Sequence, residues 1–445
     1  MKIIIFVRQF NDFDNVLPLV DYLIRVRGQK DIEIYGARED GYQRCNKHLS
    51  YISNILGKNV ISFTNTCIGS RDRVLLKAAI RLKKINDPKN KLVKFIFNII
   101  TVNLVRFLYY FAGGSVKFFI NDLPKDTIIL ADFGNEGQFP FKYLIKYSHK
   151  RSITILSYLH GYSIFSNVDS YSFKQPMLGI KFNKIAQKIL FGKYSKEYYD
   201  KYLVGIQQRD TYLSSANHDG FSAQSSVVEI GIPRYTREWI DRFIKRYSEF
   251  DKTAKLGGSN VDKFHEYETN IGFNVTLFTS DSKFNVDEKE LSNTIELLAS
   301  CSNINLIIKM HTRGCTPELM RETNFKYSQY ICEYDSSEII EWADIGIVYG
   351  TSMSIQMLIE QLVVIVPSYI DSNTTILEEN GVCVNAYSLE YLHNFLLHYP
   401  DVANLPDQNN INYFIKKFVY GDCNTYKELM DKFCYFLDEY SAPTN

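Results

Sequence analysis

Two stretches, Ser152-Ile-Thr-Ile-Leu-Ser-Tyr-Leu-His160-Gly161 and Ile304-Asn-Leu-Ile-Ile-Lys309-Met-His311, each end a short apolar run with a histidine. An apolar run of this length between polar segments is typical of a strand buried in a parallel sheet. In open α/β sheets, ligands bind beyond the carboxyl ends of the strands. We therefore expect two sheets, one in each half of the chain, whose histidines face one ligand site.

The chain of 445 residues is too long for one ordinary core, because domains usually hold about 100–200 residues. Short apolar runs alternate with helix-length segments in both halves, which predicts parallel sheets covered by helices. The expected strands are 2–7, 32–37, 59–64, 127–131, 152–159, 201–206, 226–230, 274–279, 304–310, 330–333, 345–349 and 363–366. The expected helices include 16–27, 288–300, 352–361 and 388–398.

A polar stretch with a Gly-Gly pair, 251–270, separates the two halves and predicts a linker or loop. We therefore expect three parts: a Rossmann-like domain on the acceptor side at 1–240, a linker at 241–270, and a Rossmann-like domain on the nucleotide-donor side at 271–445.

The net charge of +1 gives the whole protein no attraction for nucleic acid, so we expect no nucleic-acid partner. The segment between Arg71 and Lys125 does carry an excess of positive charge, because it contains twelve Lys and Arg residues but three Asp residues. This basic segment contains an aromatic-rich apolar run, 95–112, which polar residues interrupt and which barely reaches the length of a membrane-spanning helix. Segment 71–125 is either an interfacial element on an anionic membrane or a helix buried on the sheet beside a solvated basic face.

The eight cysteines are scattered, without a CxxC pair or a zinc-ligand spacing, which indicates reduced thiols. The first residues form an apolar run that predicts a strand rather than a signal peptide. We therefore expect a cytoplasmic protein. Neither the dinucleotide motif G-x-G-x-x-G nor the P-loop motif is present.

Several short motifs follow one another in a defined order. They are Leu159-His160-Gly161, Gly231-Ile-Pro-Arg234, Val275-Thr-Leu-Phe-Thr-Ser280, Ile307-Ile-Lys-Met-His311 and Ala343-Asp-Ile-Gly-Ile-Val-Tyr-Gly-Thr-Ser352. In this order the chain resembles GT-B transferases over roughly residues 150–370. It is most similar to the CDP-glycerol glycerophosphotransferases of teichoic-acid and capsule synthesis, and more loosely to the capsule glycosyltransferases that use CMP-Kdo.

The resemblance implies an α/β GT-B fold, with two Rossmann-like domains facing a central cleft. It also implies transfer of a sugar or polyol phosphate from an activated nucleotide, CMP- or CDP-linked, to a bacterial surface polysaccharide such as capsule, lipopolysaccharide O-antigen or teichoic acid. The positions that match the family motifs are His160, Arg234, His311, Thr351 and Ser352. The positions that depart from them are Thr312 for a proline, Tyr349 for an aspartate and Gln356 for an acidic residue.

The leaving group of such a transfer is a nucleotide phosphate, whose charge cationic side chains and backbone amides can neutralise. The candidates for this role are Arg234, Lys309, His311 and the turn that contains Gly350, Thr351 and Ser352. Glu360 is either an acidic ligand of the ribose or an exposed helix residue. Basic side chains and helix-terminal amides can neutralise this charge without a metal ion, so we expect a metal-independent reaction without a cofactor.

The acceptor hydroxyl must lose a proton, and a histidine with a pKa near neutrality is the usual base. We expect His160 in this role, with Asp132 and Glu136 as carboxylate alternatives that a configuration-retaining reaction would favour. The expected partners are a nucleotide-activated sugar donor and a glycan or lipid-linked glycan acceptor, with peripheral contact to the inner face of the membrane.

Two other functions remain open. A non-hydrolysing UDP-GlcNAc 2-epimerase of the same fold would need no acceptor and no membrane patch. A catalytically inactive GT-B scaffold, which binds nucleotide or glycan within a membrane assembly, would explain the departures at Tyr349 and Gln356.

Overall fold

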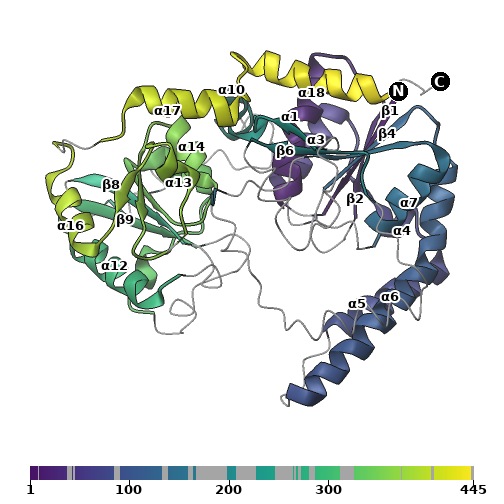
Figure 1. The fold of residues 1–445 in the computed structure, drawn as a ribbon, viewed down its shortest axis with the longest axis horizontal. Coiled ribbons are helices and arrows are strands. Elements are labelled where there is room, and N and C mark those ends of the chain that lie inside the picture. Colours follow the sequence, from purple (N-terminus) through teal and green to yellow (C-terminus); the bar gives the residue numbers. More distant parts are fainter. Residues whose placement is uncertain are drawn as a thin grey trace.

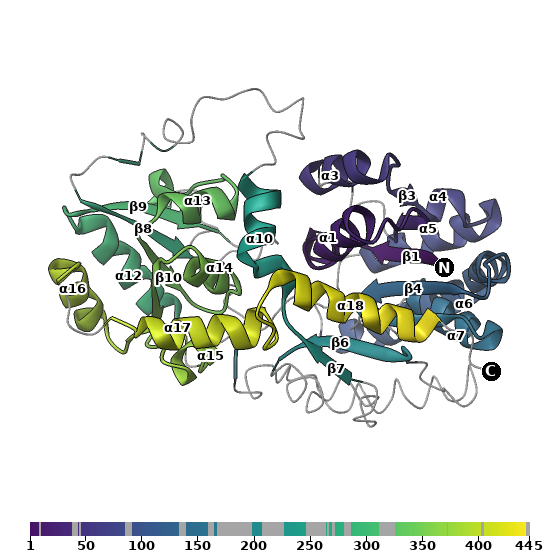
Figure 2. The same ribbon diagram turned by 90° about the horizontal axis from the view of Figure 1, so that it is seen from above.

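The chain forms two parallel α/β units, which contain a seven-stranded and a five-stranded sheet (Figure 1). The computed structural model describes residues 1–8, 10–37, 43, 46–84, 91–132, 139–158, 164–166, 198–206, 227–245, 264, 267–268, 272–279, 286–310, 325–371, 373–401 and 405–441. The two sheets lie side by side, with the short helix α10 (Arg237–Trp239) between them (Figure 2). The expected fold class, two Rossmann-like α/β domains, is confirmed.

The first sheet has the strand order β3-β2-β1-β4-β5-β6-β7, and all its strand pairs are parallel. Its strands are β1 (Lys2–Val7), β2 (Ile32–Gly36), β3 (Ile61–Ser62), β4 (Thr127–Asp132), β5 (Thr154–Tyr158), β6 (Lys201–Gly205) and β7 (Val227–Ile230). The direction in which strands are added reverses between β1 and β4. In doubly wound sheets, this reversal marks the place where ligands bind.

Helices cover both faces of the first sheet, because successive residues of a strand point to opposite sides. In β1, Ile3 and Ile5 pack on one side, and Ile4 and Phe6 pack on the other. The first side meets α1 (Phe10–Arg25), α3 (Asn46–Leu56) and α18 (Tyr426–Ser441). The second side meets α4 (Phe63–Thr66), α5 (Ser70–Lys84), α6 (Lys91–Asn121) and α7 (Phe141–Arg151).

The second sheet has the order β12-β11-β10-β8-β9 and is also parallel, with its reversal between β8 and β10. Its strands are β8 (Phe273–Phe278), β9 (Ile304–Lys309), β10 (Ile345–Val348), β11 (Val363–Pro367) and β12 (Val384–Ala386). One face packs on α12 (Glu288–Ser300) and α16 (Leu389–His398). The other packs on α13 (Ser336–Trp342), α14 (Met353–Ile359), α15 (Ile376–Glu379), α17 (Gln408–Phe414) and the π-helix η9 (Ile415–Val419).

The segment after β7 belongs to both cores. It contains the 3-10 helix η3 (Pro233–Tyr235), α10 and the π-helix η4 (Ile240–Lys245). Ile232, Tyr235 and Ile240 are buried in the core of the second unit, whereas Trp239 and Phe243 are buried in the core of the first. Because its apolar side chains alternate between the two cores, this segment fixes one unit against the other.

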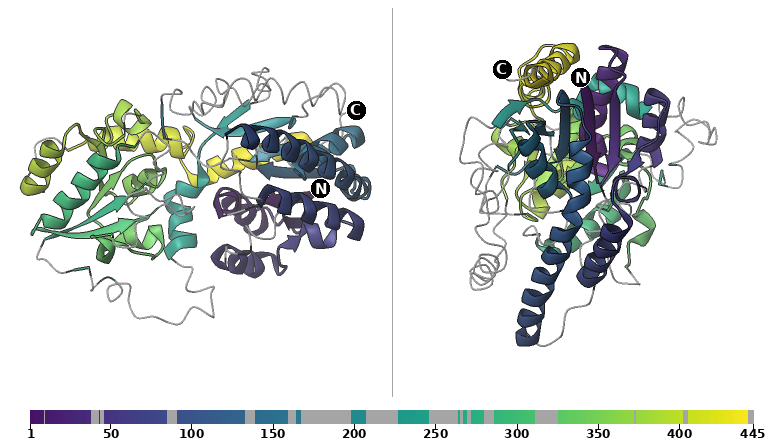
Figure 3. Two further views of the ribbon diagram at one scale, coloured as in Figure 1. Left: turned by 90° about the horizontal axis from the view of Figure 1, so that it is seen from below. Right: turned by 90° about the vertical axis from the view of Figure 1, so that its right-hand side faces the viewer.

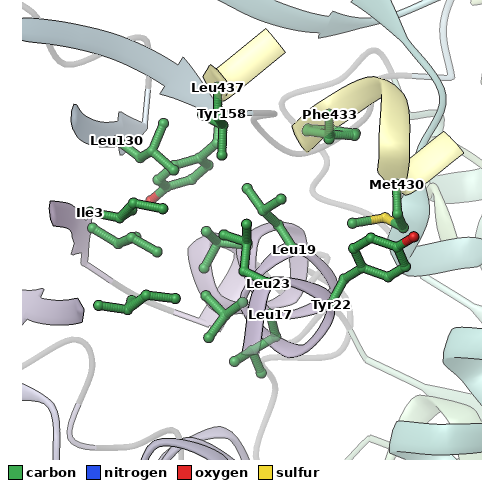
Figure 4. Packing of buried hydrophobic residues seen from close by; sticks show 14 of the residues in the cluster. Ile3, Leu17, Leu19, Tyr22, Leu23, Leu130, Tyr158, Met430, Phe433 and Leu437 are labelled. Carbon is green, nitrogen blue, oxygen red and sulfur yellow. The ribbon is translucent and has the colours of Figure 1, made fainter. Parts of the chain in front are cut away.

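The chain returns to the first unit through α18, which packs on α1 and the first sheet (Figure 4). Met430, Phe433 and Leu437 of this helix contribute to the same core as Leu19 and Leu23 of α1. The predicted division into 1–240, 241–270 and 271–445 did not anticipate this return, and its boundaries stay a prediction.

The two crossing segments touch each other backbone to backbone. The amide of Ile232 donates to the carbonyl oxygen of Val419 at 2.7 Å. A Cβ atom added to Gly231 would lie 2.3 Å from that same oxygen, so only glycine fits here.

The predicted strands agree with the structure except at two places. Of 59–64, only Ile61–Ser62 is a strand, because α4 begins at Phe63. The other exception is 330–333. Those residues lie in and after the 3-10 helix η8 (Ser328–Tyr330), and Ile331 forms a single bridge to Ile308. The apolar stretch within these residues is short and flanked by polar residues, so it does not form a further strand next to β9. The three-residue strand β12 was not predicted. Helix α12 has the predicted bounds.

A pair of adjacent glycines in α6 gives a direct test of packing on α7. A Cβ atom at Gly113 would lie 2.6 Å from the buried ring of Tyr143, whereas at Gly114 the nearest atom, Asp72 Oδ2, would be 3.8 Å away. We expect Gly113→Ala to destabilise the protein by about 1–3 kcal/mol, because the ring must move. Gly114→Ala should stabilise it by about 0.5–1 kcal/mol. Urea unfolding of both variants checks the pair, and equal effects at the two positions would contradict the packing described.

Candidate active site at the junction of the two sheets

The carboxyl ends of both sheets lie beside the segment that follows β7. Arg234 of η3 forms an ion pair with Asp14 of α1, the helix that follows β1, and the nitrogen–oxygen distance is 3.4 Å. The next residue, Tyr235, donates its hydroxyl hydrogen bond to Ser352 Oγ, just beyond β10, at 2.9 Å. Because β1 and β10 each border a reversal of strand order, one short segment contacts both expected ligand-binding edges.

A third element completes this arrangement. His48 of α3 places its Nε2 atom 2.8 Å from Asp14 Oδ1, and its side chain is almost entirely buried. We call Asp14, His48, Arg234, Tyr235 and Ser352 the junction cluster. These five residues lie in or beside α1, α3, η3 and α14, at positions from 14 to 352 of the chain.

The charges of the junction cluster hold Asp14 ionised. Burial raises the pKa of Asp14, but the neighbouring Arg234 and the hydrogen bond from His48 outweigh it, so the pKa lies below its ordinary value. Burial lowers the pKa of Arg234, but Tyr235 and Asp14 raise it above its ordinary value. Arg234 is therefore a permanent cation, although only 11% of its side chain is exposed.

Arg234 is suited to binding an anion. Its guanidinium carbon lies 4.5 Å from the centroid of the Tyr235 ring, which fixes the plane of the group. Guanidinium carries five N–H donors in a rigid fork that matches phosphate geometry. Asp14 provides a single ion-pair contact at 3.4 Å, so the fork retains donors for a phosphate placed between the sheets.

The predicted turn after β10 makes contacts of two kinds. Gly350 has a positive φ of 67°, which turns the chain from the strand into α14. Thr351 Oγ1 accepts a hydrogen bond from the backbone N–H of Met353 at 3.3 Å, while Ser352 receives the bond from Tyr235. Thr351 thus caps the start of α14, and Ser352 connects the turn to the junction cluster.

Glu360, the predicted ribose ligand, follows the end of α14. Its Oε2 atom lies 2.7 Å from Arg237 Nη1, and the guanidinium of Arg237 also donates to the carbonyl of Ile359. Glu360 therefore connects the second unit to the crossing segment, and its ribose contact stays a prediction.

Lys309, a predicted phosphate ligand, ends β9 and is buried. Its Nζ atom donates to the carbonyl oxygen of Tyr334 at 2.5 Å. Burial lowers the pKa of Lys309, although the neighbouring Asp335 opposes this shift. Asp335 itself forms a 3.4 Å ion pair with Lys47 of the first unit. Lys309 therefore supports a second contact between the units, and its phosphate contact stays a prediction.

Asp132, a predicted alternative base, ends β4 at the reversal of the first sheet and is fully buried. Its carboxylate forms an ion pair with Arg8, which follows β1. The backbone N–H of Arg8 donates to Asp12 Oδ2 at 2.7 Å, and its Nε donates to the same oxygen at 3.2 Å. A carboxylate in this ion pair is better placed to hold Arg8 than to accept a proton.

Three predicted residues, His160, Glu136 and His311, lie outside the described residues. The proton-accepting role of His160 or Glu136 and the phosphate contact of His311 therefore stay predictions. Among the residues that the structure does describe, no cluster of three or more His, Cys, Asp or Glu side chains is arranged to hold a metal ion.

The sequence-based prediction missed a buried acid, Asp371, four residues beyond β11. Its side chain is 4% exposed, and Oδ2 has no hydrogen-bond partner among the described residues. Burial raises its pKa to about 6, although Asn373 opposes the shift. The flanking loop contacts the first unit, because Ile376 donates its backbone N–H to the carbonyl of Ile164 at 2.8 Å. The position of Asp371 just past a strand end was the signal that could have identified it.

The raised pKa of Asp371 predicts how its contribution to stability changes with pH. The unfolded chain has the ordinary value of 3.8, so the contribution is fully present below that pH and is lost as the pH rises through about 6. A difference of this size corresponds to about 3 kcal/mol. Relative to the wild type, Asp371→Asn should therefore gain stability between pH 4 and 7.

Asp431 offers a control of opposite sign. Its pKa is lowered below the ordinary value of 3.8 by hydrogen bonds from Lys427 and Tyr22, so Asp431→Asn should lose stability relative to the wild type as the pH rises toward 3.8, and should differ from it by a constant amount at higher pH. Urea unfolding of both variants from about pH 2.5 to about pH 7 measures the Asp431 trend in the acidic part of the range and the Asp371 trend in the rest. A constant difference between Asp371→Asn and the wild type would show that Asp371 is not held as described.

Comparison with known proteins finds solved structures with a similar fold. No protein-family model matches the sequence, and no curated protein matches it. A glycosyltransferase from Rickettsia africae is 12% identical, with a TM-score of 0.50 over 100% of this chain and 99% of that chain. A UDP-N-acetylglucosamine 2-epimerase is 10% identical, with a TM-score of 0.51 over 99% of this chain and 96% of that chain. The wall teichoic acid polymerase TagF is 13% identical, with a TM-score of 0.47 over 98% and 90%.

At these identities the likeness concerns the fold alone. The two parallel α/β units agree with the two Rossmann-like domains that the resemblance in the sequence motifs implies. The chain therefore has the GT-B fold, which it shares with solved glycosyltransferases and with a nucleotide-sugar epimerase.

Proposed function

We propose that the protein is a GT-B transferase, which moves a sugar or polyol phosphate from a nucleotide donor to a bacterial surface glycan. The observation that carries this proposal is the position of Arg234. It is a buried, permanently charged guanidinium in a segment that contacts the carboxyl edges of both sheets. A nucleotide phosphate is an anion of the kind that such a guanidinium binds.

The chemistry follows from the charge that develops on the leaving group. As the bond to the nucleotide breaks, negative charge grows on the departing phosphate, and a preorganised cation stabilises it. Arg234 takes this role in the proposal, with His311 and the Gly350–Ser352 turn as further phosphate contacts. The acceptor hydroxyl gives its proton to His160, or to Glu136 if configuration is retained, whereas Asp132 is held by its ion pair with Arg8. No metal ion or cofactor takes part in this proposal.

The donor and the acceptor follow from the resemblance in the motifs. We propose a CMP- or CDP-linked donor, and an acceptor in capsule, O-antigen or teichoic-acid synthesis. The place of reaction in the proposal is the cytoplasm, at the inner face of the membrane, where a lipid-linked glycan is available.

The epimerase alternative rests on the shared fold with a UDP-N-acetylglucosamine 2-epimerase. Incubation with UDP-GlcNAc alone separates the two functions, because an epimerase forms product without an acceptor. Incubation with CMP-, CDP-, UDP- and GDP-activated donors together with membrane-derived glycan should release free nucleotide for at least one donor. Product from UDP-GlcNAc alone would overturn the transferase proposal, and nucleotide binding without turnover would favour the inactive scaffold.

A further inference from the structure

Helices α5 and α6 form a hairpin that extends away from the first sheet (Figures 1 and 3). Its base is fixed by Asp72 of α5, whose Oδ2 accepts hydrogen bonds from Ser115 Oγ at 2.5 Å and from the Ser115 backbone N–H at 3.2 Å. The backbone N–H of Gly69 donates to Ser115 Oγ at 3.0 Å. The hairpin is therefore a fixed part of the first unit at its base.

Helix α6 has two different apolar faces. One contains Ala112, Val116 and Ile120, four residues apart, which are buried in the core of the first unit. The other, which we call the aromatic stripe, is exposed and contains Leu104, Phe107, Tyr110, Phe111 and Phe118. Residues 104, 107, 111 and 118 recur at the three- and four-residue spacing that places side chains on one side of a helix. The first face confirms that part of segment 71–125 is buried on the first unit, and the second face is available for an interfacial role, which stays a prediction.

The rings of the aromatic stripe pack against each other on the outside of the molecule. The Phe107 and Phe111 rings are 4.7 Å apart, and those of Tyr110 and Phe111 are 5.6 Å apart. Phe118 is 72% exposed. Contiguous exposed apolar surface of this kind marks an interaction site rather than ordinary solvent-facing surface.

The same hairpin is strongly basic. Its two helices contain ten Lys and Arg but one acidic residue, Asp72, whose carboxylate is directed at Ser115 within the hairpin. Lys77, Arg81 and Lys117 are exposed. The charge of the hairpin is complementary to an anionic surface, whereas a second copy of the chain would bring two basic hairpins together.

We propose that the α5–α6 hairpin binds the surface of an anionic phospholipid bilayer. The aromatic stripe lies at the boundary of headgroups and acyl chains, and the basic residues contact the headgroup phosphates. Within the described ranges, no helix combines the length and apolar character needed to cross a bilayer. This proposal rests on the proposed function in one respect, because transfer to a lipid-linked acceptor requires contact between the protein and the membrane.

Vesicle sedimentation tests this surface with the full chain. The wild-type protein should sediment with vesicles of equal parts phosphatidylglycerol and phosphatidylcholine, remain free of vesicles of phosphatidylcholine alone, and be released from the anionic vesicles by high salt. The double variant Lys77→Glu/Arg81→Glu should lose at least about thirtyfold in vesicle affinity. Phe111→Ser/Phe118→Ser should lose at least about tenfold.

Tyr435→Ser is the matched control, because Tyr435 of α18 is also 72% exposed but lies outside the hairpin. This variant should bind vesicles like the wild type. Nucleotide binding, measured on the same samples, should be unchanged in all three variants. If the wild-type protein binds nucleotide but not anionic vesicles, the membrane proposal is wrong and the proposed function stands. If it binds vesicles but no nucleotide, the proposed function is wrong and the membrane proposal stands.

Two further outcomes would overturn the proposal. One is unchanged vesicle affinity in both hairpin variants. The other is self-association of the wild type that Phe111→Ser/Phe118→Ser abolishes, which would show that the aromatic stripe binds a second copy.

Discussion

Replacement of Arg234 by Ala is expected to lower transfer by about a hundredfold to a thousandfold, the usual cost of removing one donor that stabilises transition-state charge. Arg234 is the buried cation that contacts both units of the fold through its own ion pair and through its neighbour Tyr235. Its loss removes the proposed phosphate contact. Both kcat/KM for transfer and the Kd of the nucleotide product should therefore change.

The design must separate binding from folding, because Arg234→Ala leaves the Asp14 carboxylate buried without its cation. Arg234→Lys keeps a positive charge beside Asp14 but removes the two-donor fork, so it should fold normally and still lose most of its activity. Arg237→Ala is the matched control. Arg237 also contacts the second unit, through Glu360, but 37% of its side chain is exposed. Equal activity losses at positions 234 and 237 would contradict the assignment of Arg234.

Replacement of His160 by Ala is expected to abolish detectable transfer, with a loss of about a hundredfold to ten thousandfold for removal of a general base. The fold should remain intact, as circular dichroism and thermal unfolding can verify. His398→Ala, at the exposed end of α16, provides a control and should leave activity unchanged.

The same experiment ranks the competing bases. If His160→Ala retains activity while Glu136→Gln loses it, the proton acceptor is the carboxylate and a configuration-retaining reaction gains support. Asp132→Asn should instead destabilise the fold, because it removes one of the two buried carboxylates that pair with Arg8.

The sheets were predictable because their signal is local. Runs such as Ile3–Phe6 are apolar at every position, which only a strand covered on both faces requires, and the structure buries each of these residues on one of two cores. The two Rossmann-like domains came from the motif resemblance, and the structure agrees with them, whereas the strand order within each sheet was not predicted. Arg234 was predicted to bind phosphate because it occupies the arginine position of the motif Gly231-Ile-Pro-Arg234.

The rest depends on contacts that no local pattern encodes. Asp14 meets Arg234 from far away in the sequence, and His48 contacts Asp14 from a different helix. Helix α18 returns to the first core from the far end of the chain. The spacing of the apolar residues in α6 indicates two apolar faces. Which of the two is buried depends on α7 and on the sheet against which α6 packs. The pairing of Glu360 with Arg237 is likewise a product of how the two units meet.

The central claim is that the junction cluster binds a nucleotide phosphate, and a titration of the wild-type protein with CMP, CDP, UDP and GDP tests it directly. Thermal unfolding should shift upward with at least one nucleotide, by the equivalent of about 2.7 kcal/mol at a hundred times its Kd. The shift should disappear in Arg234→Lys and persist in Arg237→Ala. No shift with any of the four nucleotides, or an equal shift in both variants, would contradict the account.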